Sequence, residues 1–130
     1  MTVPARLSPE GFQQLMTELA AAWNSGDAKR AASLFAEDAV YVDPSRRKFY
    51  RGRAVLRGLF DRTSQRAPMR IAWRHVFFDE PSQTGAAEFT FDWSGHAFTG
   101  VAIVIIEEGL VSRWREYQVE SDSPFEPVAG

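Results

Sequence analysis

The second half of the chain contains four stretches of alternating or apolar residues that predict consecutive β-strands. The expected strands span Met69–Phe78, Gly85–Trp93, Ala97–Ile106 and Leu110–Val119. Only short turns separate them, so each strand is expected to pair antiparallel with the next. The third strand is apolar on both faces, which indicates that both faces are covered. Helices would cover one face, and either a partner subunit or a tight internal core would cover the other.

The first half of the chain predicts three helices that precede this sheet. Ser8 is typical of an N-cap, and the helix that follows it is expected to run to about Asn24. A second, short helix capped by Asp27 would end at Ala36, and a third is expected over about Gly52–Gln65. The buried side of the third helix would consist of Val55, Leu56, Leu59 and Phe60.

Length and composition bound the class of protein. A chain of 130 residues is long enough for one domain, and helices followed by antiparallel strands indicate the α+β class. Residues 1–7 and 122–130 are expected to be loose ends. The formal charge of −2 gives no electrostatic reason to expect nucleic-acid binding. Because the chain has no cysteine, no signal-peptide pattern and no long apolar run, we expect a cytoplasmic protein without a membrane partner.

A short apolar strand at Ala39–Asp43 carries an acid and a phenol. Period-two alternation places Tyr41 and Asp43 on one face, and Pro44 stops the strand. If that face borders a cavity, the cavity has a candidate base and a candidate hydrogen-bond donor. The polar loop that follows, Pro44–Tyr50, is rich in basic side chains, which are expected to be solvated or, alternatively, to attract an anionic substrate.

The order of these elements and two local motifs resemble the nuclear transport factor 2-like (SnoaL-like) superfamily. The motifs are FAEDAVYVDP at 35–44 and YRGRAVLRGLF at 50–60, and the resemblance extends from about Ser8 to Val119. It implies a cone-shaped, curved antiparallel sheet packed on three N-terminal helices, with a pocket at its mouth and a homodimer formed through the sheet. Members include isomerases, epoxide hydrolases, cyclases, dehydratases and non-catalytic binding modules, so the resemblance leaves the function open.

Ketosteroid isomerase, one enzyme of this superfamily, matches only in part. Its general-base aspartate falls on Asp43. Its oxyanion-hole tyrosine and protonated aspartate fall on Leu19 and near Val104, which are apolar. Without these donors nothing evident stabilises a dienolate, so the resemblance does not imply steroid isomerisation.

Limonene epoxide hydrolase also matches in part. The segment EEGLVSRWREY at 107–117 resembles its last strand and places Glu116 at one catalytic aspartate. Tyr41 matches its water-binding tyrosine, and Asp43 lies where it has an asparagine. Its arginine and second aspartate fall on about Phe89 and Phe91, so the acid that protonates the epoxide is missing.

Asp43 and Glu116 are the leading candidates for proton transfer. A carboxylate in an apolar pocket has a raised pKa, which suits Asp43 to proton abstraction or water activation. Alternatively, Asp43 simply ends its strand by binding backbone N–H groups of the turn. The resemblance implies that Glu116 faces inward, where it would share acid and base roles with Asp43. Otherwise Glu116 is a surface residue paired across strands with an arginine.

Tyr41 and His75 complete the catalytic candidates. Tyr41 would donate a hydrogen bond to a substrate oxygen or a water, or to one internal partner as a core phenol. His75, on the strand Met69–Phe78, would act as a proton shuttle or as a satisfied structural group. No spacing of histidine and acidic residues indicates a metal site, and we expect no cofactor.

The aromatic residues indicate the class of ligand. By resemblance they line the pocket, and together they favour a small hydrophobic molecule over a sugar or a phosphate. Packed as plain core, they would fill the pocket instead. The candidate substrate-binding residues are Trp23, Phe60, Trp73, Phe89, Phe91, Trp114 and Gln118. We therefore predict cofactor-free acid/base chemistry of the isomerase, cyclase, dehydratase or hydrolase type, with a non-catalytic ligand- or protein-binding module as the alternative.

Overall fold

The computed structural model describes residues 6–121. The helices are α1 (Pro9–Asn24), α2 (Ala28–Ser33) and α3 (Arg53–Arg66). Both predicted N-caps form. The Ser8 hydroxyl accepts a hydrogen bond from the Gly11 N–H, which begins α1. The Asp27 carboxylate accepts from the Arg30 N–H, which begins α2.

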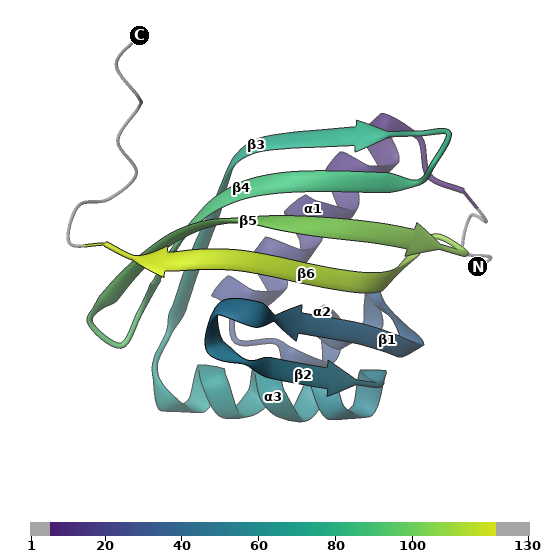
Figure 1. The fold of residues 1–130 in the computed structure, drawn as a ribbon. Helices are drawn as coiled ribbons and strands as arrows, with labels where there is room; N and C mark the ends of the chain where they lie inside the picture. The colour runs from purple at the N-terminus through teal and green to yellow at the C-terminus, as the bar shows by residue number, and fades with distance from the viewer. Residues whose placement is uncertain (1–5, 122–130) are drawn as a thin grey trace, which may run out of the picture.

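The strands form one curved, six-stranded sheet in the order β2-β1-β6-β5-β4-β3. They are β1 (Phe35–Asp43), β2 (Lys48–Arg51), β3 (Met69–Asp79), β4 (Thr84–Trp93), β5 (His96–Glu107) and β6 (Leu110–Glu120). Neighbouring strands are antiparallel, except that β1 and β6 run parallel. Figure 1 shows the helices on one side of the sheet, with α1 crossing behind it. The predicted α+β class and the cone shape are thus confirmed.

The chain leaves α2 earlier than its sequence predicts. Helical spacing favoured a helix through Ala36, but α2 ends at Ser33 and β1 begins at Phe35. Val111 of β6 donates its backbone N–H to the Leu34 carbonyl and pairs with Phe35. Pairing with this distant strand outweighs the local helical preference, and a local sequence window does not contain that information.

The predicted polar loop after β1 contains a strand. A short 3₁₀ turn at Pro44–Arg46 reverses the chain, and β2 then returns antiparallel to β1. The register sets Lys48 opposite Asp43 and Tyr50 opposite Tyr41. The strand has four residues, lies at the sheet edge and is partly charged, so its sequence signal is weak.

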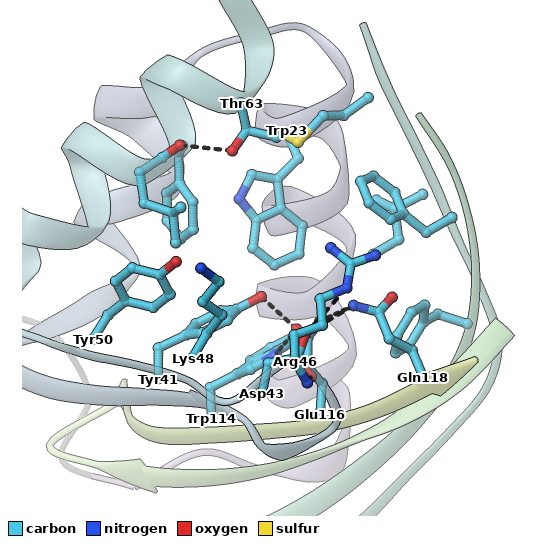
Figure 2. Close-up of a pocket in the computed structure, with 16 residues that line it drawn as sticks. Trp23, Tyr41, Asp43, Arg46, Lys48, Tyr50, Thr63, Trp114, Glu116 and Gln118 are labelled. Carbon is cyan, nitrogen blue, oxygen red and sulfur yellow. Dashed lines mark hydrogen bonds and ion pairs between the residues drawn. The ribbon is translucent and has the colours of Figure 1, made fainter. Parts of the chain in front are cut away.

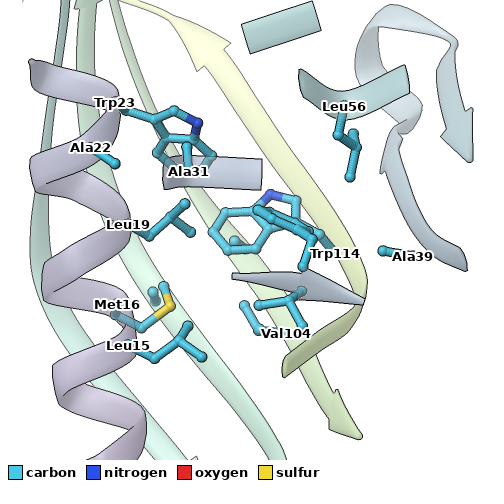
Figure 3. Close-up of a cluster of buried hydrophobic side chains, with 14 of the residues drawn as sticks. Leu15, Met16, Leu19, Ala22, Trp23, Ala31, Ala39, Leu56, Val104 and Trp114 are labelled. Atoms are coloured by element: carbon cyan, nitrogen blue, oxygen red, sulfur yellow. The ribbon is translucent and has the colours of Figure 1, made fainter. Parts of the chain in front are cut away.

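The hydrophobic core fills the space between α1 and the sheet (Figure 3). Phe12, Met16 and Leu19 of α1 are fully buried, as are Val104 of β5 and Trp114 of β6. The resemblance places the isomerase's oxyanion-hole groups on Leu19 and near Val104, and both residues belong to the core of this chain.

Helix α3 buries a narrower stripe than predicted. Leu56 and Phe60, four residues apart, are buried. Leu59 is half-buried and Val55 is 48% exposed, so the prediction that Val55 is buried is wrong. A helix that meets the core along one edge covers only the i, i+4 side chains there.

The predicted loose N-terminal end is anchored at its last two described residues. The Arg6 guanidinium donates to the backbone carbonyls of Glu80 and Pro81. Leu7 is buried, and the Gln83 side chain accepts from its N–H at 2.8 Å and donates to its carbonyl at 2.9 Å. The remaining residues of the two predicted loose ends, 1–5 and 122–130, lie outside the described residues.

The outer face of the sheet is uncovered in the single chain. On β5, Ala102 and Val104 are buried against the core, whereas Val101 on the opposite face is 38% exposed. The core therefore covers one face of this apolar strand, and nothing in the described chain covers the other. No helix among residues 6–121 is long and apolar enough to cross a membrane.

Candidate active site

A cavity of about 170 Å³ lies between the sheet and helices α1 and α3 (Figure 2). It is lined by Trp23, Tyr41, Asp43, Arg46, Lys48, Tyr50, Leu59, Phe60, Thr63, Met69, Ile71, Phe89, Phe91, Trp114, Glu116 and Gln118. The structure thus brings three of the predicted catalytic residues, Tyr41, Asp43 and Glu116, to one cavity. It also places there every predicted substrate-binding residue except Trp73.

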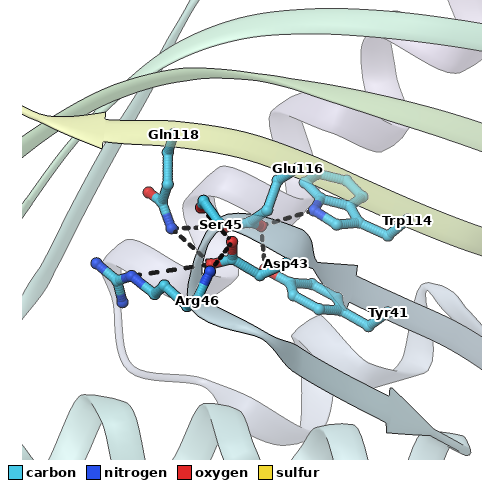
Figure 4. Close-up of polar contacts among 7 residues, drawn as sticks. All are labelled: Tyr41, Asp43, Ser45, Arg46, Trp114, Glu116 and Gln118. Carbon is cyan, nitrogen blue, oxygen red and sulfur yellow. Dashed lines mark hydrogen bonds and ion pairs between the residues drawn. The ribbon is translucent and has the colours of Figure 1, made fainter.

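Glu116 is the centre of a hydrogen-bond network at the wall of this cavity (Figure 4). Its Oε1 accepts hydrogen bonds from the Tyr41 hydroxyl and, at 2.8 Å, from Trp114 Nε1. Its Oε2 accepts from Gln118 Nε2 at 2.9 Å. The parallel pairing of β1 with β6 sets Tyr41 opposite Trp114 and so brings the phenol to the carboxylate. Donors on both oxygens are the arrangement that an ionised carboxylate requires.

Burial raises the pKa of both Glu116 and Tyr41, with different consequences for the two groups. Burial raises the pKa of Glu116 above its ordinary value, and the charge of Asp43 adds to this, while hydrogen bonds from Tyr41 and Trp114 act in the opposite direction. Burial also raises the pKa of Tyr41 well above its ordinary value, and the neighbouring charge of Glu116 adds to it. Tyr41 therefore stays a protonated donor, whereas Glu116 binds a proton more readily than an exposed glutamate does.

Asp43 borders the same cavity but is held by the turn that follows β1. Its Oδ1 accepts from the Ser45 hydroxyl at 2.7 Å and from the Arg46 N–H at 3.3 Å. Its Oδ2 accepts from Gln118 Nε2 at 3.1 Å and lies 3.9 Å from Arg46 Nε. Of the two interpretations of Asp43, the turn-capping contacts are therefore present, and they tie the carboxylate to its own turn.

Aromatic rings position the network and shape the cavity. Trp114 stacks on Tyr41 with ring centroids 5.8 Å apart, and it meets Trp23 edge-on at 5.6 Å. Trp23 in turn meets Phe60 of α3 edge-on at 5.4 Å. Edge-on and stacked pairs of this kind resist rotation of the rings, so the cavity wall is built from side chains that hold one another in place.

The model of the SnoaL-like domain matches residues 16–114, a segment that includes Tyr41, Asp43 and Trp114. The chain belongs to the SnoaL-like family. The resemblance found in the sequence is thereby confirmed. No curated protein matches the sequence.

Solved structures share the fold of this SnoaL-like domain. A candidate ketosteroid isomerase from Kribbella flavida has 23% identity over 93% of this chain and 84% of that chain, with a TM-score of 0.72. An LEH-like epoxide hydrolase from M. tuberculosis has 15% identity over 82% and 80%, with a TM-score of 0.71. A ketosteroid isomerase-like fold from Catenulispora acidiphila, in complex with trimethylamine, has 19% identity over 79% and 83%, with a TM-score of 0.70. Likeness at this level of identity shows the fold alone.

Two predicted site residues on β3 of the SnoaL-like domain do not border the cavity. The Trp73 ring packs 6.4 Å from that of Trp23, and its Nε1 donates to the Met16 carbonyl at 2.7 Å. The His75 side chain is 60% exposed, and its Nδ1 lies 2.7 Å from a Glu88 oxygen. Strict alternation would place both residues on one face, but a bulge between them shifts the register and turns His75 outward. Among the described residues no group of three acidic or histidine side chains is placed to hold a metal ion.

Sequence reasoning missed seven residues that line the cavity of the SnoaL-like domain. They are Arg46, Lys48, Tyr50, Leu59, Thr63, Met69 and Ile71. The basic loop was expected to be solvated or to attract an anionic substrate. The Arg46 side chain is 41% exposed, and its guanidinium also pairs with Asp43 and lies 4.5 Å from the centroid of the Phe98 ring. The alternation of Lys48 and Tyr50 after the turn is the signal that could have revealed a strand facing the cavity.

Proposed function

We propose that this SnoaL-like chain is an enzyme that performs acid/base chemistry without a cofactor on a small hydrophobic molecule. One observation carries the proposal: Glu116 is a buried carboxylate that borders an aromatic cavity and is held by three hydrogen-bond donors. A base needs an orientation fixed by its neighbours and a pKa closer to the working pH than that of an exposed carboxylate. Glu116 has both, so it takes the leading role for which Asp43 was the first candidate.

In this proposal Glu116 accepts a proton from carbon or from a water. Tyr41, which stays protonated, orients Oε1, while Gln118 orients Oε2 and leaves that oxygen a lone pair for the incoming proton. Asp43 raises the proton affinity of Glu116 through its charge and holds Gln118 in place. Return of the proton to another substrate atom gives isomerisation or cyclisation. Loss of a leaving group gives dehydration, and attack by the activated water gives hydrolysis.

A second candidate is a non-catalytic binding module with the same cavity. The turn contacts of Asp43 favour it, because they give that carboxylate a structural role. The core positions of Leu19 and Val104 favour it too, because no oxyanion hole of the isomerase type is present at those two sites. The two candidates differ in whether Glu116 exchanges a proton with the bound molecule.

The titration of Glu116 tests the observation on which the enzyme proposal rests. Tyr41→Phe removes a hydroxyl that stabilises the ionised carboxylate, so the pKa of Glu116 is expected to rise further than it already does in the wild type. The acid limb of any activity that needs ionised Glu116 would then move to higher pH. Carbon-13 NMR of the glutamate carboxyl groups measures the shift directly. Tyr50→Phe is the matched control, because Tyr50 makes no hydrogen bond to Glu116, and it should leave the titration unchanged. An equal shift in both variants would contradict the assigned role of Tyr41.

We also propose that the protein forms a homodimer through the outer face of the sheet. We further propose that it works in the cytoplasm, because a chain without cysteine has no disulfide that would need an oxidising compartment. Large apolar side chains gather on that face without a cover in the described chain. They are Phe77, Val101, Tyr117 and Val119. The strand pairings bring Val101 opposite Tyr117, which makes the patch continuous across β5 and β6. Exposed apolar patches of this kind mark interfaces between proteins.

Charge placed in the patch should separate the subunits. Val101→Lys is expected to convert a dimer to a monomer in size-exclusion chromatography with light scattering, because a lysine cannot be buried unpaired at an interface. Val55→Lys is the matched control: Val55 is an exposed valine on α3, away from the sheet. A wild-type monomer, or an unchanged dimer in the Val101 variant, would refute the interface.

A further inference from the structure

Two buried polar atoms at the cavity lack hydrogen-bond partners among the described residues. They are the indole nitrogen of Trp23 and the amide oxygen of Gln118, and both residues line the cavity. Trp23 is only 6% exposed, so water in the bulk does not satisfy its N–H. Buried polar groups in folded proteins are nearly always paired. The free indole N–H therefore indicates a ligand that places a hydrogen-bond acceptor beside Trp23.

Two more donors border the cavity on β2. Lys48 and Tyr50 alternate on one face of this strand and stand opposite Asp43 and Tyr41 in the register. Within the described part of the chain, neither the Lys48 ammonium nor the Tyr50 hydroxyl has a hydrogen-bond partner. Figure 2 shows both groups pointing inward, on the same side of the cavity as the Trp23 nitrogen. We call Trp23, Lys48 and Tyr50 the donor wall.

The opposite side of the cavity consists of acceptors. The carboxylates of Glu116 and Asp43 and the free oxygen of Gln118 lie there, with Arg46 paired to Asp43 (Figure 2). An anionic group in the cavity is repelled by this side and attracted by the Lys48 ammonium. The charge distribution thus fixes which end of a ligand carries the negative charge.

The volume matches a ligand of about one ring. An apolar cavity of about 150 Å³ is large enough to hold benzene, and the cavity here is about 170 Å³. Phe89, Phe91 and Trp114 offer apolar surface to such a ring. A fused multi-ring molecule such as a steroid would have to leave most of its surface outside the cavity.

We propose that the cavity binds a single-ring organic molecule whose oxyanion, a phenolate or a ring carboxylate, lies against the donor wall of Trp23, Lys48 and Tyr50. This assignment deepens the proposed function, because it names the class of substrate on which Glu116 would act. The three donors come from α1 and β2. They do not coincide with the positions of the isomerase's oxyanion hole, which are core residues in this chain.

A chromogenic phenol tests the orientation of the oxyanion. The probe is 4-nitrophenol, whose neutral and ionised forms absorb at different wavelengths. Bound against the donor wall, the probe is stabilised as the phenolate, so bound probe should ionise at lower pH than free probe. A phenol that instead keeps its proton and donates a hydrogen bond to the Glu116 carboxylate is stabilised in the neutral form and should ionise at higher pH. Ionisation at higher or unchanged pH, or absence of binding, overturns the proposal.

Variants of two adjacent cations separate contact from long-range attraction. Lys48→Gln is expected to weaken binding of 4-nitrophenolate about tenfold, because it removes a charge-assisted hydrogen bond. Arg47, one position before Lys48, does not line the cavity. Arg47→Gln removes the same charge there and should change the affinity by about twofold at most. Equal weakening by both variants overturns the contact. Tyr50→Phe, which removes one hydroxyl, should weaken binding as well.

The indole resonances report on Trp23 without any substitution. In nitrogen-15 NMR the Trp23 Nε1–H signal should move on addition of 4-nitrophenolate, because its hydrogen bond forms only with the ligand. The Trp93 Nε1–H already donates to the Thr63 carbonyl at 3.0 Å and should move less. A Trp23 signal that stays in place overturns the proposal. Because these readouts need no proton transfer to Glu116, binding with the expected ionisation but without turnover of any substrate would remove the proposed catalysis and leave the donor wall standing.

Discussion

Glu116→Gln is expected to lower kcat/KM about a thousandfold on any substrate that the protein turns over. Positioned acid/base groups contribute roughly 10²- to 10⁴-fold to rates, and glutamine cannot accept the substrate proton. The substitution keeps the size of the side chain and an oxygen that can accept from Tyr41 and Trp114. The amide nitrogen would face that of Gln118, which also donates to Asp43, so the variant loses the hydrogen bond between positions 116 and 118. The measurement is steady-state kinetics on a panel of single-ring ketones, epoxides and hydroxylated compounds, with thermal unfolding as the check on folding.

Asp43→Asn is the control that separates the two carboxylates. Asparagine retains an oxygen for the Ser45 hydroxyl and the Arg46 N–H, so the turn should survive. If Asp43 acts only through its charge and through Gln118, the variant should lose about tenfold in kcat/KM. A far larger loss in Asp43→Asn than in Glu116→Gln would reverse the assignment and make Asp43 the base. No turnover by the wild type on the whole panel, with ligand binding retained, would favour the binding module.

Most of the fold could be predicted because its signals are local. The cap residues of α1 and α2 form the predicted hydrogen bonds, and the alternation along β4 matches its buried face. The start of β1 could not be predicted, because it depends on backbone pairing with Val111, about seventy-five residues away in the chain. The strand β2 was missed for a similar reason. Four partly charged residues become a strand only because β1 offers them an edge.

The sequence predicted which acidic and phenolic residues form the candidate site, but not which of the two carboxylates would act as the base. Alternation puts Tyr41 and Asp43 on one face of β1, the family resemblance implies that Glu116 faces inward, and the structure brings the three together. Which acid is free to act depends on hydrogen-bond partners, and the contacts of Asp43 with its own turn become visible only in three dimensions. His75 was misplaced because period-two alternation assumes a regular strand. A bulge between Trp73 and His75 moves every later residue of β3 to the other face.

Gly85→Ala is expected to destabilise the fold by about 3 kcal/mol, a typical value for overpacking a tight core. Gly85 lies on β4 opposite Phe78 and under the N-terminal part of α1. The Phe12 ring is fully buried there and stacks on Phe78 with centroids 4.4 Å apart. A methyl group at position 85 would lie 2.6 Å from Phe12 Cε2 and 2.9 Å from the Phe77 carbonyl oxygen. Neither a ring wedged in the core nor a strand backbone can move aside cheaply.

Gly11→Ala, on the helix that packs over Gly85, is expected to stabilise the fold instead. A methyl group there would meet its nearest neighbours, in Leu7 and Ser8, at 3.4 Å, which is an ordinary contact. Because alanine loses less conformational freedom than glycine on entering a helix, this variant should gain about 0.5–1 kcal/mol. Urea unfolding followed by circular dichroism measures both, with the slope of the transition as the check that both remain two-state. Equal stability of the two variants would mean that the Phe12 ring does not rest on Gly85, and α1 would then be held against the sheet by other contacts.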